Sequence, residues 1–281
     1  MRKICNQEQL IARAPVEPNE AMQQNSREIE ELYAHWNHYD ILPDVIRCLR
    51  VRSDLAAPQR LMRESVDALS RAMIHDPLSG VNFSMRGRRY INLGEFELAA
   101  ADFAMAARLL PENWYVWYHL GLCNLILGDL ERAKLAYDQC AMIPTTRSLD
   151  VALRNWRWIT YMRLGEKEKA AALLEDVDAS WDMDGTDNYL RLLLLYKGAL
   201  TPEEAAKIPE GDEEPILSAT TQGFGVANYY RIQGDMVNYR KALQATLDVG
   251  REEAWPCFGF AAAEYELKRL DQVSACSAEN Q

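Results

Sequence analysis

The sequence predicts an all-α protein, a right-handed superhelical solenoid built from antiparallel helix pairs. Residues 80–146 contain two successive units with a 34-residue period, whose small and aromatic residues coincide: Gly87 with Gly121, Gly94 with Gly128, Ala99 with Ala133, and Phe103 with Tyr137. A fixed period of this length is typical of stacked helix pairs. The small residues fall where two helices would cross, and the rings fall where they would pack. With only 14 Gly and 11 Pro among 281 residues, the chain also lacks the composition of a disordered protein.

Net charge and hydropathy exclude two classes of partner. The formal net charge is -11 and the pI is near 5.0. General nucleic-acid binders need a basic face that releases counterions from the phosphate backbone, so we expect no nucleic-acid partner. No stretch approaches the run of about 18 apolar residues that a membrane-spanning helix requires. We therefore expect no membrane partner either.

The cysteines favour a reducing compartment. None of them forms a C-x-x-C pair or the spacing of a disulfide scaffold; they are Cys5, Cys48, Cys123, Cys140, Cys257 and Cys276. Near the N-terminus, the polar run from Asn6 to Gln9 interrupts any apolar segment of a signal peptide. The expected location is the cytoplasm.

The N-terminal quarter is predicted to contain a polar extension and two helices. Residues 1–25 form the extension, and residues 26–79 hold N-terminal helices that include a divergent first repeat. A helix is expected from Ser26, with Ile29, Leu32, Tyr33 and Trp36 on one face, and the segment 40–43 ends it. A linker containing Asp54 and Pro58 precedes a second helix over 61–75.

The following unit has the clearest pattern, and the next repeats it. The residues that define its pattern are Phe83, Arg86, Gly87, Tyr90, Gly94, Ala99, Phe103 and Pro111. The second unit has Trp117, Leu120, Gly121, Gly128, Ala133 and Tyr137 at matching offsets. This pattern resembles the tetratricopeptide repeat, which has an aromatic residue, Leu-Gly, Tyr, Ala, Phe and Pro at these places. The chain departs from it at Asn124, where the family has Tyr, and at Pro144, one place early.

Elementary packing accounts for the same residues. Gly87 and Ala99 let two antiparallel helices approach closely, while Tyr90 and Phe103 fill the crossing. Gly94 supplies the left-handed residue that ends the first helix of the pair.

Beyond this region the helix pairs continue with a looser period. Residues 164–170 copy 127–133 at an offset of 37, which implies three inserted residues around 145–150. Thr201 and Pro202 form a strong helix start, and residues 210–215 are expected to be a solvated acidic loop. Helices are expected over 222–232, 239–247 and 255–267. The repeat array thus spans 80–270, and residues 271–281 form a frayed tail.

The resemblance implies a binding groove lined by the first helices of successive pairs. Matched to the groove-facing positions of the family, the candidate binding residues are Arg88, Asn92, Tyr118, His119, Asn155, Trp156, Arg163, Asn188, Tyr189, Tyr196 and Asn228. Asn can bond a peptide backbone twice, and Arg can pair with a carboxylate. For Tyr118 and Trp156, packing between repeats is an equal alternative. For Arg88, Asn92 and Asn155 we expect groove exposure, since Arg and Asn are seldom fully buried.

No motif indicates catalysis, a metal or a cofactor. His35 and His38 share a helix face with Asp40 nearby but lack a third ligand at fixed spacing. The acidic run 176–187 fails the calcium-loop pattern, because Ser180 and Arg191 fall where carboxylates belong. Cys123 and Cys140 lie on the apolar stripes of one repeat, so we interpret them as small buried hydrophobes.

These features predict a non-enzymatic scaffold or adaptor that binds a protein or peptide in its concave groove. Two alternatives stay open. One is a small-ligand receptor or enzyme with a pocket enclosing His119, Asn155 and Asn188. The other is a homo-oligomer in which the N-terminal segment or the Trp255 helix occupies the groove of a neighbour.

Overall fold

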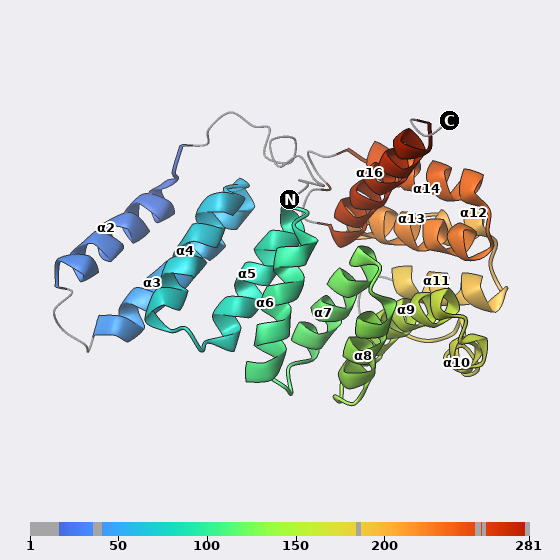
Figure 1. Cartoon of the computed structure of the whole chain (residues 1–281), viewed down its shortest axis with the longest axis horizontal. Helices are drawn as coiled ribbons and strands as arrows, with labels where there is room; N and C mark the ends of the chain where they lie inside the picture. The colour runs from blue at the N-terminus through green and yellow to red at the C-terminus, as the bar shows by residue number, and fades with distance from the viewer. Residues whose placement is uncertain (1–16, 36–40, 184–186, 251–253, 255–256, 279–281) are drawn as a thin grey trace. The chain divides into compact units, whose positions relative to one another are not determined.

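In the computed structural model of the chain (Figure 1), residues 17–35, 41–183, 187–250, 254 and 257–278 are described, with side chains up to residue 272. Every regular element in these ranges is a helix, which confirms the all-α prediction. None of the described helices combines the length and apolar composition that crossing a bilayer requires. The chain divides into two compact units, one of residues 6–116 and the other of residues 1–5 and 117–281.

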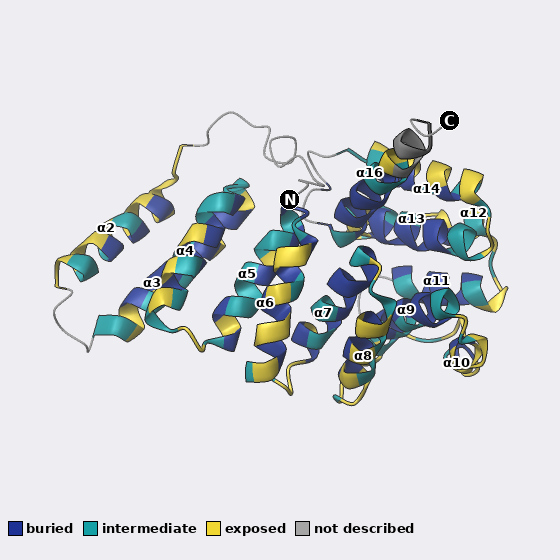
Figure 2. Ribbon diagram, viewed as in Figure 1, coloured by how far each residue is buried: buried dark blue, intermediate teal, exposed yellow. Residues whose placement is uncertain are grey.

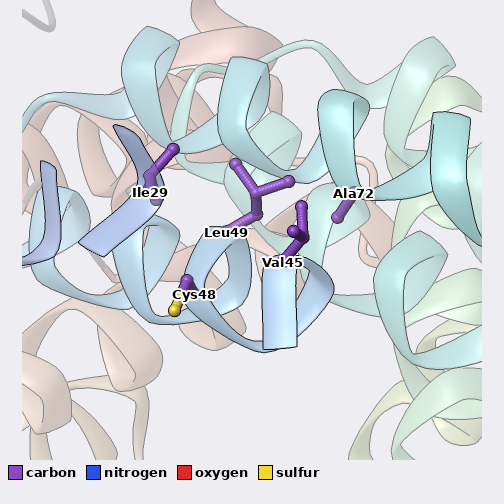
Figure 3. Close-up of a cluster of buried hydrophobic side chains, with 5 residues drawn as sticks. All are labelled: Ile29, Val45, Cys48, Leu49 and Ala72. Carbon is purple, nitrogen blue, oxygen red and sulfur yellow. The ribbon is translucent and has the colours of Figure 1, made fainter. Parts of the chain in front are cut away.

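The unit of residues 6–116 consists of helices that pack with their neighbours in sequence. These are α2 (Glu20–Ala34), α3 (Leu42–Ala56), the 3-10 helix η2 (Ala57–Gln59), α4 (Met62–His75), α5 (Gly80–Asn92), α6 (Phe96–Leu109) and the first residues of α7 (Trp114–Leu127). Helix α3 packs on α4 and α5 on α6, while α2 covers α3. Ile29 from α2, Val45, Cys48 and Leu49 from α3 and Ala72 from α4 form one apolar cluster (Figure 3).

The unit of residues 117–281 continues the alternation of a first and a second helix. It contains the rest of α7 followed by α8 (Leu130–Ala141), α9 (Arg147–Leu164), α10 (Lys167–Ala172), α11 (Asn188–Lys197), α12 (Pro202–Ala206), α13 (Pro215–Ile232), α14 (Met236–Asp248) and α16 (Phe258–Ala278). The first helices α9, α11, α13 and α16 pack side by side in that order. Their faces toward one another are buried, whereas the short second helices α10 and α12 are largely exposed (Figure 2).

Glycines end the first helices as the sequence predicts. The residues after α5, α7, α9, α11 and α13 include a glycine with φ between 69° and 84°; these are Gly94, Gly128, Gly165, Gly198 and Gly234. A side chain at such a φ would be strained, so glycine is the residue that turns the chain into the second helix at little cost.

Two other glycines set the closeness of the helix pairs. A Cβ at Gly87 would lie 2.9 Å from the Phe103 ring, and a Cβ at Gly121 would lie 2.3 Å from the Tyr137 ring. Both rings are fully buried. The predicted crossing of small residue and ring is therefore confirmed in both repeats of the 34-residue period.

The N-terminal predictions need two corrections. Helix α2 begins at Glu20 rather than Ser26, because Asn19 caps it by accepting from the backbone N of Met22 at 3.0 Å. The predicted linker around Asp54 is the helix α3, in which Pro43 stands at the start, where a proline is tolerated, rather than marking an end. Trp36, expected on the first helix, lies outside the described residues.

The C-terminal predictions differ in a similar way. Helix α13 begins at Pro215, seven residues before the predicted start at Gln222, again with proline in the first turn. Helix α16 continues to Ala278 through the predicted tail. At the start of that tail, Asp271 pairs with Arg240 at 2.5 Å. Thr201 caps α12 in a full capping box, as its sequence predicts.

The inserted residues before Gly165 lengthen a first helix. Helix α9 has 18 residues, against 14 in α7. Its N-cap Thr146 accepts from the backbone N of Leu149, so the extra residues add a turn at the N-terminal end. This longer end of α9 contributes to the cleft described below.

The contact between Gly121 and the Tyr137 ring predicts a specific stability loss. Gly121→Ala should lower the free energy of unfolding by about 1–3 kcal/mol, because the added Cβ overpacks the crossing. Urea unfolding followed by circular dichroism measures this loss. In a Tyr137→Leu background the same substitution should cost less, and an equal cost in both backgrounds would contradict the tight crossing.

Candidate functional site

A cleft of about 810 Å³ opens at the N-terminal ends of the three first helices α9, α11 and α13. Its lining residues come from these helix ends and from the loop before α13: Ser148, Leu149, Ala152, Met183, Asp187, Asn188, Tyr189, Pro209, Glu210, Gly211, Asp212, Glu213, Glu214 and Leu217. We call it the acidic cleft. The helix ends meet there because α9 packs on α11 and α11 on α13.

The lining of the acidic cleft includes four apolar or aromatic side chains, which we call the floor: Leu149, Ala152, Tyr189 and Leu217. Leu149 and Tyr189 are half-buried, Ala152 is buried, and Leu217 keeps 36% of its surface exposed. Apolar area of this kind gains free energy when a ligand removes it from water, roughly 25 cal/mol for each Å² covered. The floor can therefore hold an apolar side chain of a partner.

The rim of the acidic cleft is strongly negative. Five lining residues, which we call the rim, carry carboxylates, namely Asp187, Glu210, Asp212, Glu213 and Glu214, and none of the described lining residues is Lys or Arg. Asp187 pairs with Arg191 at 3.6 Å, whereas no ion pair joins the other four to a described residue. Asp212 also fixes the loop, because its Oδ1 accepts from the backbone N of Glu214 at 2.8 Å.

The predicted groove aromatics meet one another in the interior of the same unit. Trp156 on α9 donates from Nε1 to the Tyr118 hydroxyl at 2.7 Å, and that oxygen lies 3.3 Å from the Tyr189 hydroxyl. The Trp156 ring also contacts Phe224 and Phe258, with centroids 6.2 and 5.5 Å away. Burial raises the pKa of the Tyr118 phenol well above its ordinary value. Of the two interpretations left open for Tyr118 and Trp156, packing between repeats is the one that this geometry favours.

Asn155 corrects the expectation of groove exposure, because its side chain has no exposed surface. Its Oδ1 accepts from the Tyr196 hydroxyl at 2.9 Å, while the Tyr196 ring stacks on Trp158 with centroids 3.8 Å apart. The Nδ2 of Asn155 has no partner among the described residues. A buried amide of this kind holds α9 to α11 and is not available to a ligand at the surface.

Asn188 and Asn228 are also buried, at 4% and 2% exposure. Asn228 donates to the Phe224 carbonyl one turn earlier at 3.0 Å, so its amide is used within α13. Asn188 differs, because it lines the acidic cleft. Its Nδ2 reaches Ser218 Oγ at 3.5 Å, the outer limit of a hydrogen bond.

The remaining predicted site residues do not gather in one place. Arg88 is exposed and Asn92 half-buried on α5, in the unit of residues 6–116. His119 packs edge-on against Tyr118, with ring centroids 5.5 Å apart. Arg163 donates to the Leu125 carbonyl at 3.4 Å, and its pKa falls to about 10, chiefly because burial disfavours the charged form. The acidic cleft is lined by Asn188 but not by His119 or Asn155, so it is not the pocket that the small-ligand alternative requires.

The cysteines and acidic runs support no reactive centre in the described residues. Burial raises the pKa of the Cys140 thiol to about 12 and raises that of Cys123 as well. The described part of the chain contains no group of three or more His, Cys, Asp or Glu side chains placed to hold a metal ion. Asp176 instead pairs with Arg154 at 2.5 Å. His38 and Asp40 lie outside the described residues.

Sequence reasoning missed the acidic cleft, although it noted its parts. The loop 210–215 was predicted to be a solvated connection, and its density of carboxylates was the available signal. Only the packing of α9, α11 and α13 brings Leu149, Tyr189 and Leu217 into one cleft with that loop.

Comparison with known sequences identifies one repeat. Residues 115–144 match the family model described as Tetratricopeptide repeat. A stretch of 73 residues is 30% identical to the BBSome complex member BBS4 of Xenopus tropicalis. This alignment covers 26% of the chain and 14% of that relative, so the chain spans only a small part of the length of the relative.

Solved structures of similar form have low sequence identity. They include the MamA protein, with a TM-score of 0.46 at 14% identity over 75% of this chain and 95% of that one. BtubC (BKLC) from P. vanneervenii has a TM-score of 0.48 at 13% identity, and the match covers 84% of this chain and 91% of that one. A chain in the structure of Naa15/Naa10 bound to HypK-THB has a TM-score of 0.38 at 17% identity, and the match covers 85% of this chain and 39% of that one.

The hydrogen bond from Tyr196 to Asn155 predicts a coupled stability effect. Tyr196→Phe keeps the ring on Trp158 but leaves the buried Asn155 Oδ1 with one donor fewer, so the free energy of unfolding should fall by about 1–3 kcal/mol. Urea midpoints of the two single variants, the double variant with Asn155→Ala and the wild type form a double-mutant cycle. Purely additive losses would contradict the contact.

The buried thiols predict slow alkylation. Cys123 and Cys140 should stay unmodified when the native chain is treated with iodoacetamide at about pH 8, since the thiolate is the reactive form. After unfolding in urea both should react, which peptide mapping by mass spectrometry measures. Rapid modification of either cysteine in the native protein would show that its site opens in solution.

Proposed function

We propose that this chain, which carries a tetratricopeptide repeat at residues 115–144, is a protein-interaction scaffold that holds a peptide segment of its partner in the acidic cleft. A protein-interaction role is the general task of such repeats. The observation that carries the finer proposal is a hollow of about 810 Å³ at the ends of three successive first helices. Its volume falls within the range of about 300–1,000 Å³ that is common for ligand clefts.

The arrangement of α9, α11 and α13 suits an extended peptide segment better than a small molecule enclosed in a deep pocket. All three helices contribute lining side chains, namely Leu149 and Ala152 from α9, Tyr189 from α11 and Leu217 from α13, so one extended segment would contact three successive first helices. Stacked repeats commonly use such extended surfaces for recognition. The aromatic residues behind the floor, including Trp156 and Phe224, support this shape because their burial fixes the spacing of the helices.

A reducing, cytoplasmic location and the absence of enzymatic activity belong to the same proposal. The described cysteines Cys48, Cys123, Cys140 and Cys257 are free thiols, which fits such a compartment. The predicted groove residues that are buried, chiefly Asn155 and Trp156, take a supporting role and do not contact the partner.

The cleft predicts that one exposed leucine controls binding. A display library of random peptides selected on the immobilised full-length protein should give binders whose affinity falls at least tenfold in Leu217→Lys, because the substitution places a long charged chain on the floor. Leu135→Lys is the matched control, since Leu135 is a leucine with 63% exposure on α8, outside the cleft. Peptides that bind the Leu217→Lys variant as tightly as the wild type would place the binding surface elsewhere.

A further inference from the structure

The acidic cleft holds more negative charge than its own contacts neutralise. Glu210, Glu213 and Glu214 are exposed on one short loop and form no ion pair with any described residue. Lys207 precedes the loop, and no ion pair joins it to these carboxylates in the described chain. Like charges placed this close repel one another, so a bound cation lowers the electrostatic energy of the rim.

A polar group under the rim has bonding capacity left for a peptide backbone. The Asn188 amide nitrogen has two hydrogens, and its single contact in the described residues is the 3.5 Å approach to Ser218 Oγ. This side chain is 96% buried yet lines the cleft. Such an amide can donate its remaining hydrogen to a carbonyl oxygen of an extended chain.

We propose that the acidic cleft selects a basic, extended segment of a partner protein, in which Lys or Arg side chains flank one apolar side chain. The apolar side chain lies on Leu149, Tyr189 and Leu217, and the flanking cations face the carboxylates of the loop. Asn188 bonds the backbone between them. This inference rests on the proposed function, because it assumes that the cleft is the binding surface.

The spread of the carboxylates distinguishes this occupant from others. They follow the loop from Glu210 to Glu214, and the described residues hold no group of three or more His, Cys, Asp or Glu side chains that could hold a metal ion. A second copy of this chain carries a net charge of -11 and is repelled by the rim. A separate basic partner has the complementary charge.

The two parts of the cleft contribute differently to recognition. Exposed ion pairs add little affinity each, but complementary charge raises the association rate and rejects acidic sequences. The apolar floor supplies most of the affinity. Neutralising the loop should therefore reduce charge selectivity more than it reduces binding of an apolar peptide.

The test selects peptides on the wild type and compares their affinity for the wild type with their affinity for a variant in which the loop carboxylates are neutralised. Peptides from the display library should be enriched in Lys and Arg beside an apolar residue. Their Kd should rise about tenfold in the triple variant Glu210→Gln, Glu213→Gln, Glu214→Gln. The triple control Glu97→Gln, Glu131→Gln, Glu168→Gln removes equal charge from exposed positions outside the cleft and should leave Kd unchanged. Raising salt from about 0.05 M to about 0.5 M should weaken wild-type binding and affect the neutralised loop much less.

Each contrary outcome has its own meaning. Two outcomes would overturn the basic partner: selected peptides that lack basic residues, or selected peptides that bind the triple variant as tightly as the wild type. If such peptides still bind Leu217→Lys more weakly, the cleft remains the binding site. Peptides indifferent to Leu217→Lys would overturn the proposed function itself. Light scattering of the wild type that shows an oligomer lost in the neutralised loop would assign the cleft to a second copy and so overturn the separate partner. Circular dichroism confirms that each variant is folded.

Discussion

Two of the helix pairs, α5 with α6 and α7 with α8, depend on a close crossing between a glycine of the first helix and an aromatic ring of the second. At Gly121 no side-chain carbon fits, because the Tyr137 ring occupies the position that a Cβ would take. The same contact joins Gly87 and Phe103 within the other unit. A pair packed this closely presents a nearly fixed face to the next pair, so the rest of each unit is built on a regular spacing. That spacing determines which side chains of neighbouring first helices can touch.

In the unit of residues 117–281, neighbouring first helices are in contact, and this contact buries several side chains that were expected to line a groove. Trp156, Tyr118 and Tyr189 fill the space between α7, α9 and α11, and Phe258 extends the cluster to α16. Burying large rings stabilises such an interior, and their polar ends find partners within it. A cleft remains at the N-terminal ends of α9, α11 and α13, where side chains of these helices and of the acidic loop before α13 line it. The binding proposal therefore moves from the middle of the helices to their ends.

The fold could be predicted from sequence because its signals are local. A left-handed glycine, a proline at a helix start or a capping threonine acts within a few residues, so Gly94 and Thr201 were interpreted correctly. The errors were also local in origin: Pro43 and Pro215 stand at helix starts, although proline is also common shortly after a helix end. The site was harder to predict, because exposure at a given register depends on how far apart neighbouring first helices lie. Asn155 shows this, since an amide expected at the surface is buried against Tyr196.

The sequence by itself determined the repeat length, the helix pairing and the glycine-to-ring contacts, because each of these follows from residues at fixed separation along the chain. Tertiary structure alone decided that Tyr118, Trp156 and Asn155 are buried, and that Leu149 and Leu217 line one cleft with the loop from Glu210 to Glu214. These residues are far apart in sequence, and the distance between them depends on the packing of whole helices, which no short pattern encodes.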